Sequence, residues 1–495
     1  MNTQPTTSGN ILDKLFSGEL FKNIDTSALV KQFDHSAELR SGNLAANPVV
    51  APQPLIGNVI STIPPEGIVI TQPGDYTFSK SISWIPTSPC SAITIQAANV
   101  LLDLKGYTLM AFIVKKTDQQ YHGISVIGVD SVTVQGGTIK GMSYYGINSS
   151  KASNLQVYNM TIGSISYAET VTAYLTPCGI FVDDTDGFIL QNCIIEGITV
   201  TAPSCAGIQV VESRNGYVLD CTMRNFLNND GGVQGLSYLK SWKLLTRGCV
   251  CENFQSHYEG KTITSGHTVI GYVPIFCILL EFDNCSATGM TGCCDDCHGM
   301  SVFIDAFIGV TNFRAKDVID GVTLKNTGAK ATGLEVYGYD IAITDCSVEN
   351  ITAIVPQDLQ SAGFSAWGSA IEFKGCSATK VLVTDATGVP STKFGYGTGF
   401  GWAPDPRSEF NGVPADNVLY TACTATNCQL GFDTWFHTNS TWQQISAPGC
   451  PLLILVEPKG TPRTLSMDKC SESPDGQYQQ VTITNIAENN VYPGD

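Results

Sequence analysis

Short segments in which small or apolar residues alternate with polar ones recur along most of this 495-residue chain. In the segment VLDCTMRN, Cys221 and Met223 alternate with Thr222 and Arg224. A period of two is typical of a β-strand, whose successive side chains point to opposite faces. Asn225 follows this segment, and Asn or Gly, which both favour turns, follows several others. The pattern predicts many short strands separated by tight turns.

Seven cysteines occupy the same place in these segments, and their spacing reveals an internal repeat of about thirty residues. The longest spacing separates Cys285 from Cys346, which predicts an intervening coil without cysteine near Ala315 to Val318. Gly137 and Met160 hold the same slot in earlier segments, so the repeat begins before the cysteines do. The seven cysteines are Cys193, Cys221, Cys249, Cys285, Cys346, Cys376 and Cys423.

A second motif precedes the first in many repeats and has the form Gly, bulky apolar, variable, apolar. Examples begin at Gly123, Gly179, Gly207, Gly299, Gly333, Gly399 and Gly431. Two or three short strands per repeat, without a helical period between them, are what a right-handed parallel β-helix requires. We therefore predict an all-β solenoid of about ten or more coils, in which each coil packs on its neighbours.

The cysteine slot has a physical explanation in this fold. Equivalent inward residues of successive coils stack about 4.8 Å apart, and a thiol is small and effectively apolar. Stacked, reduced core thiols are therefore favoured over disulfides. Disulfides stay open as an alternative, because adjacent coils would bring some pairs within bridging distance.

Composition agrees with a long core and limits the partners. The chain has 48 glycines, 43% hydrophobic residues and only 14% charged residues. Its net charge of −17 argues against nucleic acid and anionic membrane surfaces as partners. No apolar run is long enough to span a membrane, so we expect no membrane insertion.

Three regions are expected from the extent of the repeat. Residues 1–55 form an N-terminal cap or attachment segment with a helical stripe and a linker, residues 56–440 form the β-helix, and residues 441–495 form a C-terminal β cap or oligomer contact. The opening residues lack a secretory signal, and eighteen cysteines fit a reducing compartment. We expect a cytoplasmic protein or a part of a virion or surface assembly.

The combination of Gly-Ile-x-Val and Asn-Cys segments resembles the pectate-lyase-like right-handed parallel β-helix superfamily over about three quarters of the chain. Its members include polysaccharide lyases, polygalacturonase-like glycoside hydrolases, epimerases and phage tailspikes. The resemblance implies a polysaccharide or glycan partner bound in a groove along one strand face. A tailspike-like member would attach through residues 1–55 and form a homotrimer.

The segment CCDDCHGMSVFID, residues 293–305, contains the sharpest candidate site. It is similar to two pieces of the polygalacturonase-like hydrolases, and the order of acidic, histidine and basic residues around it is kept. The spacing differs, because the family carries the Asp pair and the histidine on different coils. Here Asp296 and His298 are two residues apart and must share one coil. The resemblance implies Asp230, Asp295, Asp296 and His298 as catalytic candidates and Arg314 and Lys316 as substrate-binding candidates. The dense group of polar residues between Asn228 and Asp305 adds Asp305 as a catalytic candidate and His267 as a substrate-binding candidate.

An inverting hydrolase needs two carboxyl groups about 6.5–9.5 Å apart, one as acid and one as base. Asp295 and Asp296 would point to opposite faces of a strand, so one of them would pair with Asp230, Glu281 or Asp305. The Asp pair could instead cap a turn.

A zinc site is disfavoured, because the ligand types that zinc takes are poorly spaced here, at Cys293, Cys294, Cys297 and His298. We therefore expect no metal or other cofactor, except calcium if the protein is a lyase.

Aromatic residues gather in the last coils and indicate a second candidate surface. Aromatic rings bind the apolar faces of sugars, while charged and amide side chains hold the hydroxyl groups. Core packing could account for about half of these rings. The substrate-binding candidates here are Trp402, Asp405, Arg407, Trp435 and His437.

Three functions are compatible with the sequence. The first is a polysaccharide-cleaving enzyme, preferably a glycoside hydrolase, because a lyase needs a high-pKa base and basic residues are few. The second is a glycan-binding spike, fibre or surface protein without catalysis. The third is an isomerase or cyclase that uses the groove as a shaped pocket.

Overall fold

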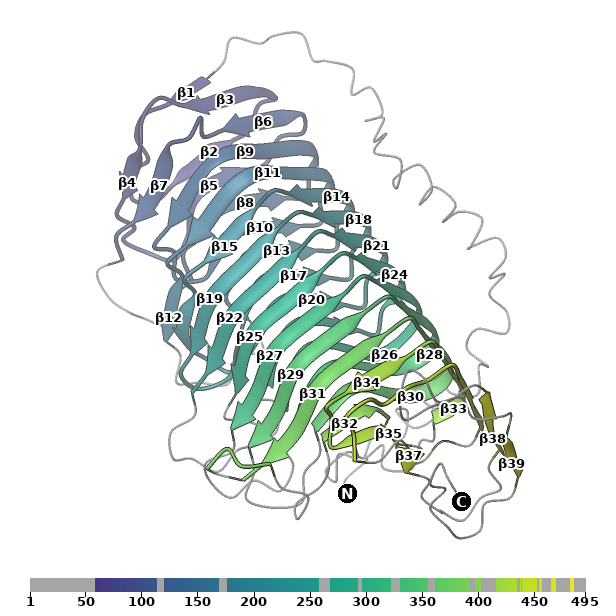
Figure 1. The fold of residues 1–495 in the computed structure, drawn as a ribbon. Helices are drawn as coiled ribbons and strands as arrows, with labels where there is room; N and C mark the ends of the chain where they lie inside the picture. Colours follow the sequence, from purple (N-terminus) through teal and green to yellow (C-terminus); the bar gives the residue numbers. More distant parts are fainter. Residues whose placement is uncertain are drawn as a thin grey trace, which may run out of the picture.

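The computed structural model describes residues 58–113, 120–168, 176–257, 268–292, 296–321, 330–354, 361–385, 387–390, 397–401, 415–433, 437, 439–451, 454–455, 464–468 and 481–484. Every regular element among them is a β-strand, so the all-β prediction is confirmed. Strands of successive coils stack along one axis into a solenoid (Figure 1). In this described part of the chain no helix is long and apolar enough to cross a membrane.

Three parallel sheets run along the solenoid, and the first of them, sheet I, bears the Gly-apolar motif. Its strands pair in parallel with the equivalent strands of the next coil. Sheet I contains β2 (Ile68–Ile70), β5 (Ser91–Ile95), β8 (His122–Ile127), β10 (Tyr145–Ser150), β13 (Cys178–Asp183), β17 (Ser204–Val211), β20 (Gly232–Leu239), β23 (Thr268–Ile275), the first parts of β26 (Asp296–Thr311), β28 (Lys330–Thr344) and β30 (Ser361–Lys374), and then β32 (Gly397–Phe400), β35 (Leu430–Asp433) and β37 (Ile454–Leu455).

Sheet II follows sheet I in each coil after a tight corner. It contains β1 (Asn58–Ile60), β3 (Gly74–Phe78), β6 (Val100–Asp103), the first parts of β9 (Asp130–Lys140) and β11 (Ser153–Gly163), β14 (Asp186–Gln191), β18 (Arg214–Leu219), β21 (Trp242–Arg247), β24 (Ile278–Asp283), the second parts of β26, β28 and β30, β33 (Ala415–Thr421), β36 (Asn439–Gln443) and β38 (Thr464–Asp468). The last strand, β39 (Val481–Thr484), pairs with β38 in the antiparallel direction.

Sheet III completes the coil and begins at the cysteine slot. It contains β4 (Ile82–Trp84), β7 (Thr108–Ala111), the second parts of β9 and β11, β15 (Ile194–Glu196), β19 (Thr222–Asn228), β22 (Val250–Ser256), β25 (Ser286–Gly292), β27 (Arg314–Gly321), β29 (Ser347–Ile354), β31 (Ser377–Thr384) and β34 (Thr424–Thr426). The short strands β12 (Ser166–Ala168) and β16 (Thr199–Thr201) extend it at its margin.

The cysteine slot is an inward position directly after a corner between sheets II and III. Asp220 adopts a left-handed backbone with φ of 52°, and the Cys221 that follows it is fully buried. The described cysteines are free. The cysteine-free coil is confirmed, but its slot is filled by Phe313, two residues before the predicted stretch, because Arg314 is in register with Ser286. An aromatic ring serves there as well as a thiol, since the slot requires only an apolar side chain.

The glycine of the Gly-apolar motif forms a ladder along the inside of sheet I. A Cβ on Gly179 would lie 2.7 Å from the carbonyl oxygen of Gly207, and one on Gly207 would lie 2.8 Å from that of Gly235. The same arrangement recurs at Gly271, Gly299, Gly333, Gly363 and Gly399. Coils therefore approach closely at this position, and a side chain there would collide with rigid backbone.

The predicted domain boundaries at residues 55 and 440 stay predictions. Residues 1–55 lie outside the described residues. In the predicted C-terminal region, β37, β38 and β39 are the strands that the structure describes beyond β36. β38 continues the parallel stack of sheet II before β39 reverses direction.

Candidate functional site

The outer face of sheet I carries the residues that the Gly-apolar motif leaves variable. Within the motif at Gly333, Leu334 and Val336 point into the core, while Glu335 between them points outward. Residues in register on successive strands form a row along the solenoid axis. This row, called the central row below, is Ser125, Asn148, Phe181, Gln209, Ser237, Val273, Ser301, Glu335 and Ser365.

A buried acid and a buried histidine meet on this face. His298 Nδ1 on β26 lies 3.6 Å from Glu335 Oε2 on β28, and their side chains are 3% and 9% exposed. Ser301 Oγ also approaches the same carboxylate oxygen, at 3.5 Å. Adjacent parallel strands produce this contact, because Ser301 is directly in register with Glu335. A carboxylate and an imidazole away from bulk water are groups suited to acid–base chemistry.

Two hydroxyl groups beside this pair have no hydrogen-bond partner among the described residues. They are Thr332 Oγ1 and Ser365 Oγ, and both are fully buried. Thr332 is in register with His298, and Ser365 is in register with Glu335. Buried polar groups are normally satisfied, so these hydroxyls identify the place where a polar ligand would complete the structure.

Aromatic rings border the pair on the same face. Phe303, Tyr337 and Trp367 are in register on β26, β28 and β30. Their ring centroids are 5.4 Å apart for Phe303 and Tyr337 and 5.5 Å apart for Tyr337 and Trp367. These three rings therefore line the same face of sheet I as His298 and Glu335.

Asp305 lies at the other end of this segment of β26, in the corner that leads to sheet II. Its carboxylate accepts hydrogen bonds from the backbone amides of Cys277 and Phe303, the latter at 2.8 Å. It continues a ladder of corner side chains in which Ser213 and Ser241 accept backbone amides of the preceding coil. Complete burial raises the pKa of Asp305 well above its usual value. This position caps backbone amides and does not adjoin His298.

Two further predicted acids, Asp230 and Asp296, belong to segments at the corner between sheets III and I. Asp230 is half-buried in the turn between β19 and β20, where its backbone amide donates to Asn228 Oδ1 at 3.1 Å. Asp296 begins β26, two coils further along the same corner. The side chain of Asp296, as well as Asp295 and His267, lies outside the described part of the chain.

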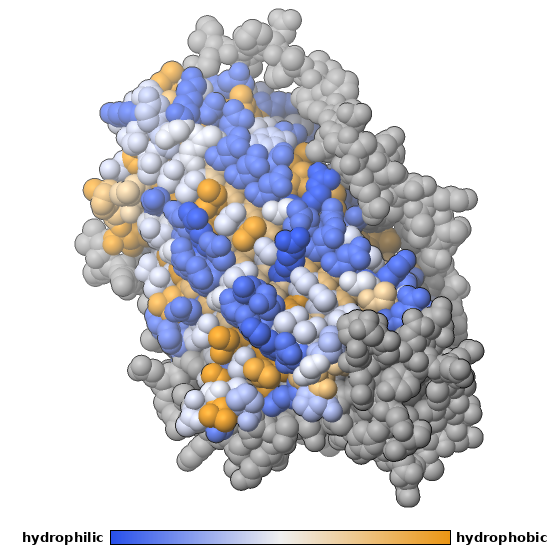
Figure 2. Space-filling view, in the orientation of Figure 1, coloured by the Kyte–Doolittle hydropathy of each residue, from blue (hydrophilic) through white to orange (hydrophobic). Residues whose placement is uncertain are grey.

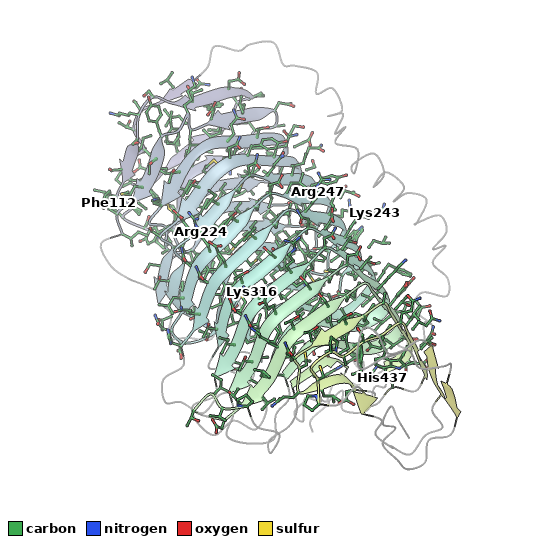
Figure 3. All side chains as sticks on the ribbon, viewed as in Figure 1. Phe112, Arg224, Lys243, Arg247, Lys316 and His437 are labelled. Carbon is green, nitrogen blue, oxygen red and sulfur yellow. The ribbon has the colours of Figure 1, made fainter. Side chains whose placement is uncertain are left out.

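Arg314 and Lys316 project from a different face. Both lie on β27 of sheet III, and Lys316 Nζ is 3.7 Å from Glu349 Oε2 on β29. On the same sheet, Arg224 forms a 2.8 Å ion pair with Glu196. Figure 3 labels Arg224 and Lys316 on this sheet, and Figure 2 shows that hydrophilic side chains are common on the surface seen from the same direction. The fold therefore separates the two predicted basic residues from His298.

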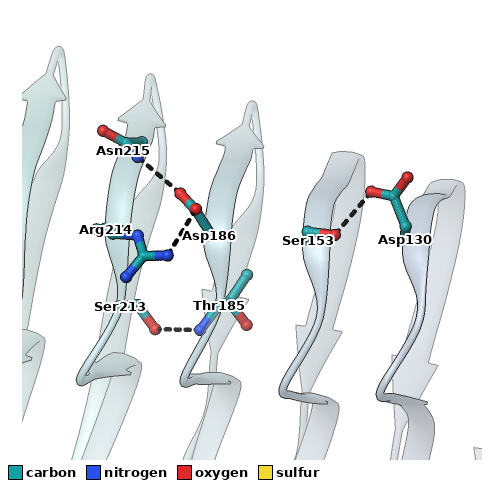
Figure 4. Close-up of polar contacts among 7 residues, drawn as sticks. All are labelled: Asp130, Ser153, Thr185, Asp186, Ser213, Arg214 and Asn215. Carbon is teal, nitrogen blue, oxygen red and sulfur yellow. Dashed lines mark hydrogen bonds and ion pairs between the residues drawn. The ribbon is translucent and has the colours of Figure 1, made fainter.

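Sheet II also carries charges that pair across coils. Arg214 Nη2 lies 2.8 Å from Asp186 Oδ2, and Asn215 donates to the other oxygen of the same carboxylate (Figure 4). These hydrogen bonds lower the pKa of Asp186. Asp130 is held similarly by Ser153 and Asn154, which lower its pKa. Both sites are exposed ladders of paired polar groups at a corner.

Of the five residues predicted for the aromatic surface, the structure describes only His437. Trp402, Asp405, Arg407 and Trp435 lie outside the described residues. His437 is buried, and its Nε2 lies 3.2 Å from the hydroxyl of Tyr420. Tyr420 stacks on Trp442 at 4.0 Å inside the core. His437 thus packs against core rings in this structure and is not presented to a groove.

Among the residues that the structure describes, no group of three or more His, Cys, Asp or Glu side chains is arranged to hold a metal ion. Cys293 and Cys294 of the disfavoured zinc set lie outside those residues. The candidate site residue that sequence reasoning missed is Glu335. The sequence contained a signal for it, because Glu335 occupies the variable, outward position of the Gly-Leu-Glu-Val motif.

Comparison with known proteins supports the fold. Residues 105–270 match the family model described as a right handed beta helix region. A mutant tailspike protein of E. coli bacteriophage HK620, solved in complex with a pentasaccharide, superposes with a TM-score of 0.50, 11% identity and coverage of 81% of this chain and 70% of that chain. Another structure of this tailspike has a TM-score of 0.49, 10% identity and coverage of 81% and 70%.

A mannuronan C-5 epimerase module from Azotobacter vinelandii has a TM-score of 0.42, 10% identity and coverage of 74% of this chain and 88% of that chain. No curated protein is significantly similar to the chain in sequence. The strand pairing and the family model agree on the architecture, and the resemblance predicted from the two motifs is confirmed at the level of the fold. This chain is a right-handed parallel β-helix.

Proposed function

We propose that this chain is a carbohydrate-active β-helix protein that binds a glycan along the outer face of sheet I and hydrolyses a glycosidic bond beside His298 and Glu335. The observation that carries the proposal is the buried His298–Glu335 contact of 3.6 Å, flanked by the unpartnered hydroxyls of Thr332 and Ser365. A tailspike with the same fold is described in complex with a pentasaccharide, which supports a glycan ligand.

The proposed hydrolysis uses an acid on one side of the glycosidic bond and a base on the other. Glu335 acts as the acid that protonates the leaving oxygen, and His298 is a positioning residue that fixes the orientation of this carboxyl group. The opposing base is the carboxylate of Asp295 or Asp296, which deprotonates the attacking water. His298 cannot be that base, because 3.6 Å from Glu335 is far below the separation that inverting hydrolysis needs.

The test is a screen of the purified full chain against a panel of polysaccharides, with new reducing ends and unsaturated-product absorbance read in parallel. Three variants are compared with the wild type: Glu335→Gln, Asp295→Asn with Asp296→Asn, and the matched control Glu349→Gln. Glu349 is also an outward glutamate, but it pairs with Lys316 on sheet III. Circular dichroism confirms that each variant is folded.

Reducing ends that disappear in Glu335→Gln and in the double variant, but persist in Glu349→Gln, would support the hydrolase. Unsaturated products would change the assignment to a lyase, which also requires a calcium dependence. Activity that survives in Glu335→Gln would contradict the role given to this residue.

A glycan-binding spike without catalysis is the second candidate, and one observation favours it. His298 and Glu335 are only 2% and 7% exposed, which suits a structural or binding contact as well as a reactive one. Binding of a polysaccharide without any new reducing end would select this function. Attachment through residues 1–55 and a homotrimer remain predictions of the same candidate, which sedimentation velocity of the full chain would measure.

A further inference from the structure

Three amide side chains on the outer face of sheet I make no hydrogen bond to the part of the protein that the structure describes. Asn148 on β10, Gln209 on β17 and Gln234 on β20 are each partly exposed, and none has a side-chain partner among the described residues. Amides elsewhere in the solenoid are used differently. Asn228 bonds Ala202 and Gly232, and Gln429 accepts two backbone amides and donates to a carbonyl. The amides on sheet I are therefore available to a ligand.

An aromatic ring lies between two of these amides. Phe181 is in register with Asn148 on one side and with Gln209 on the other. One face of the Phe181 ring is covered by Tyr145, with centroids 4.8 Å apart and an interplanar angle of 2°. Among the described residues no further ring stacks on Phe181. An aromatic ring flanked by amides matches the two surfaces of a sugar, which has an apolar face and a rim of hydroxyl groups.

Basic residues are absent from the strands that carry Asn148, Phe181 and Gln209 and from their neighbours. From β8 to β23, the strands of sheet I contain no lysine or arginine. Arg214 and Arg224 lie on the other faces, and each is paired with an acid, Arg214 with Asp186 and Arg224 with Glu196. An anionic polymer would find no cation on these described strands and would be repelled by a net charge of −17.

We propose that Asn148, Phe181 and Gln209, three successive residues of the central row, form a binding strip that selects uncharged oligosaccharides and rejects uronate polymers. This inference rests on the proposed function and names its substrate class. Hydroxyl groups of a neutral sugar can both donate hydrogen bonds to a side-chain amide and accept them from it, which makes amides suitable for recognising these hydroxyl groups.

The strip leads directly to the proposed reaction site. Successive positions of the central row are about 4.8 Å apart, and four coils separate Gln209 from Glu335, or about 19 Å. A glycan chain aligned with the solenoid axis would therefore contact Phe181 and Gln209 with one part and His298 and Glu335 with another. Cleavage would occur at a fixed distance from the sugar held by the strip.

Calorimetric binding measurements test the inference on the full chain. Neutral polysaccharides and polyuronates are compared at 50 and 500 mM NaCl, for the wild type, the double variant Asn148→Ala with Gln209→Ala, and the control Gln255→Ala. Gln255 is an exposed glutamine on β22 of sheet III, away from the strip. Circular dichroism checks that the variants are folded.

We expect neutral glycans to bind with little salt dependence, and the double variant to weaken this binding by about tenfold or more while the control leaves it unchanged. Tight, salt-sensitive binding of polyuronates would overturn the inference. Neutral binding that the double variant does not weaken would also overturn it, although the proposed function would stand. Failure of every glycan to bind would overturn both.

Discussion

The glycine ladder of sheet I provides a sharp test of how the coils are spaced, because β26 contains two glycines in opposite environments. A Cβ added to Gly299 would lie 2.5 Å from the carbonyl oxygen of Gly333 and 2.6 Å from the Cβ of Ala315. Neither neighbour can rotate away. A Cβ added to Gly309 would meet nothing within 4 Å. The same substitution in the same strand should therefore have opposite consequences.

The expected magnitudes follow from these contacts. Overpacking of this kind typically costs about 1–3 kcal/mol, and Gly299→Ala should fall at the upper end because both clashing atoms are rigid. Gly309→Ala should stabilise the protein by about 0.4–1 kcal/mol, since alanine reduces the freedom of the unfolded chain. The free energy of unfolding of the two variants should differ by about 2–4 kcal/mol.

Urea unfolding followed by far-ultraviolet circular dichroism measures this difference, with unfolding rates recorded as well because long repeat arrays can depart from two-state behaviour. Equal unfolding midpoints for Gly299→Ala and Gly309→Ala would refute the reasoning. So would a destabilised Gly309→Ala variant beside an unaffected Gly299→Ala variant.

Two further predictions follow from buried ionisable groups. Burial lowers the pKa of His122 from 6.5 to about 4. Between these pH values the unfolded chain binds a proton at His122 that the folded chain does not. The free energy of unfolding should therefore fall by about 3 kcal/mol as the pH falls from 6.5 to 4. Urea midpoints at pH 7.5 and 4.5 should show a smaller loss for His122→Gln than for the wild type, and equal losses would contradict this assignment. The hydrogen bond with Cys428 lowers the pKa of the half-buried Cys450, whereas burial raises the pKa of Cys205. Brief treatment of the native protein with iodoacetamide, followed by peptide mass spectrometry, should label Cys450 well before Cys205, and equal labelling would show that burial does not control thiol reactivity here.

Much of the fold was readable from the sequence because each coil repeats the same local requirements. A left-handed corner followed by a small or apolar residue produces the Asn-Cys segments, and the close approach of coils produces the Gly-apolar motif. These constraints act within a coil or between identical positions of adjacent coils. The one misplaced slot, Phe313, was hidden because an aromatic residue meets the same requirement without resembling cysteine.

Only part of the candidate site could be predicted from the sequence. His298 was identified from its neighbours in sequence, but its partner Glu335 was not. Ser301 and Glu335 are 34 positions apart in the chain and directly opposite each other in the structure. Conversely, Asp305 belongs to the same short segment as His298 but faces a corner and caps backbone amides. Proximity in sequence was a poor guide wherever a strand continues past a corner.

The sequence by itself determined the repeat, the all-β class and the inward positions, because the alternation of side chains and the steric limits at glycine are local properties of the chain. Only the tertiary structure decided which outward residues of different coils meet, since the loops between strands vary in length and the register of one coil on the next sets the pairing. That register placed His298 beside Glu335, left Arg314 and Lys316 on another face, and aligned Asn148, Phe181 and Gln209 in one row.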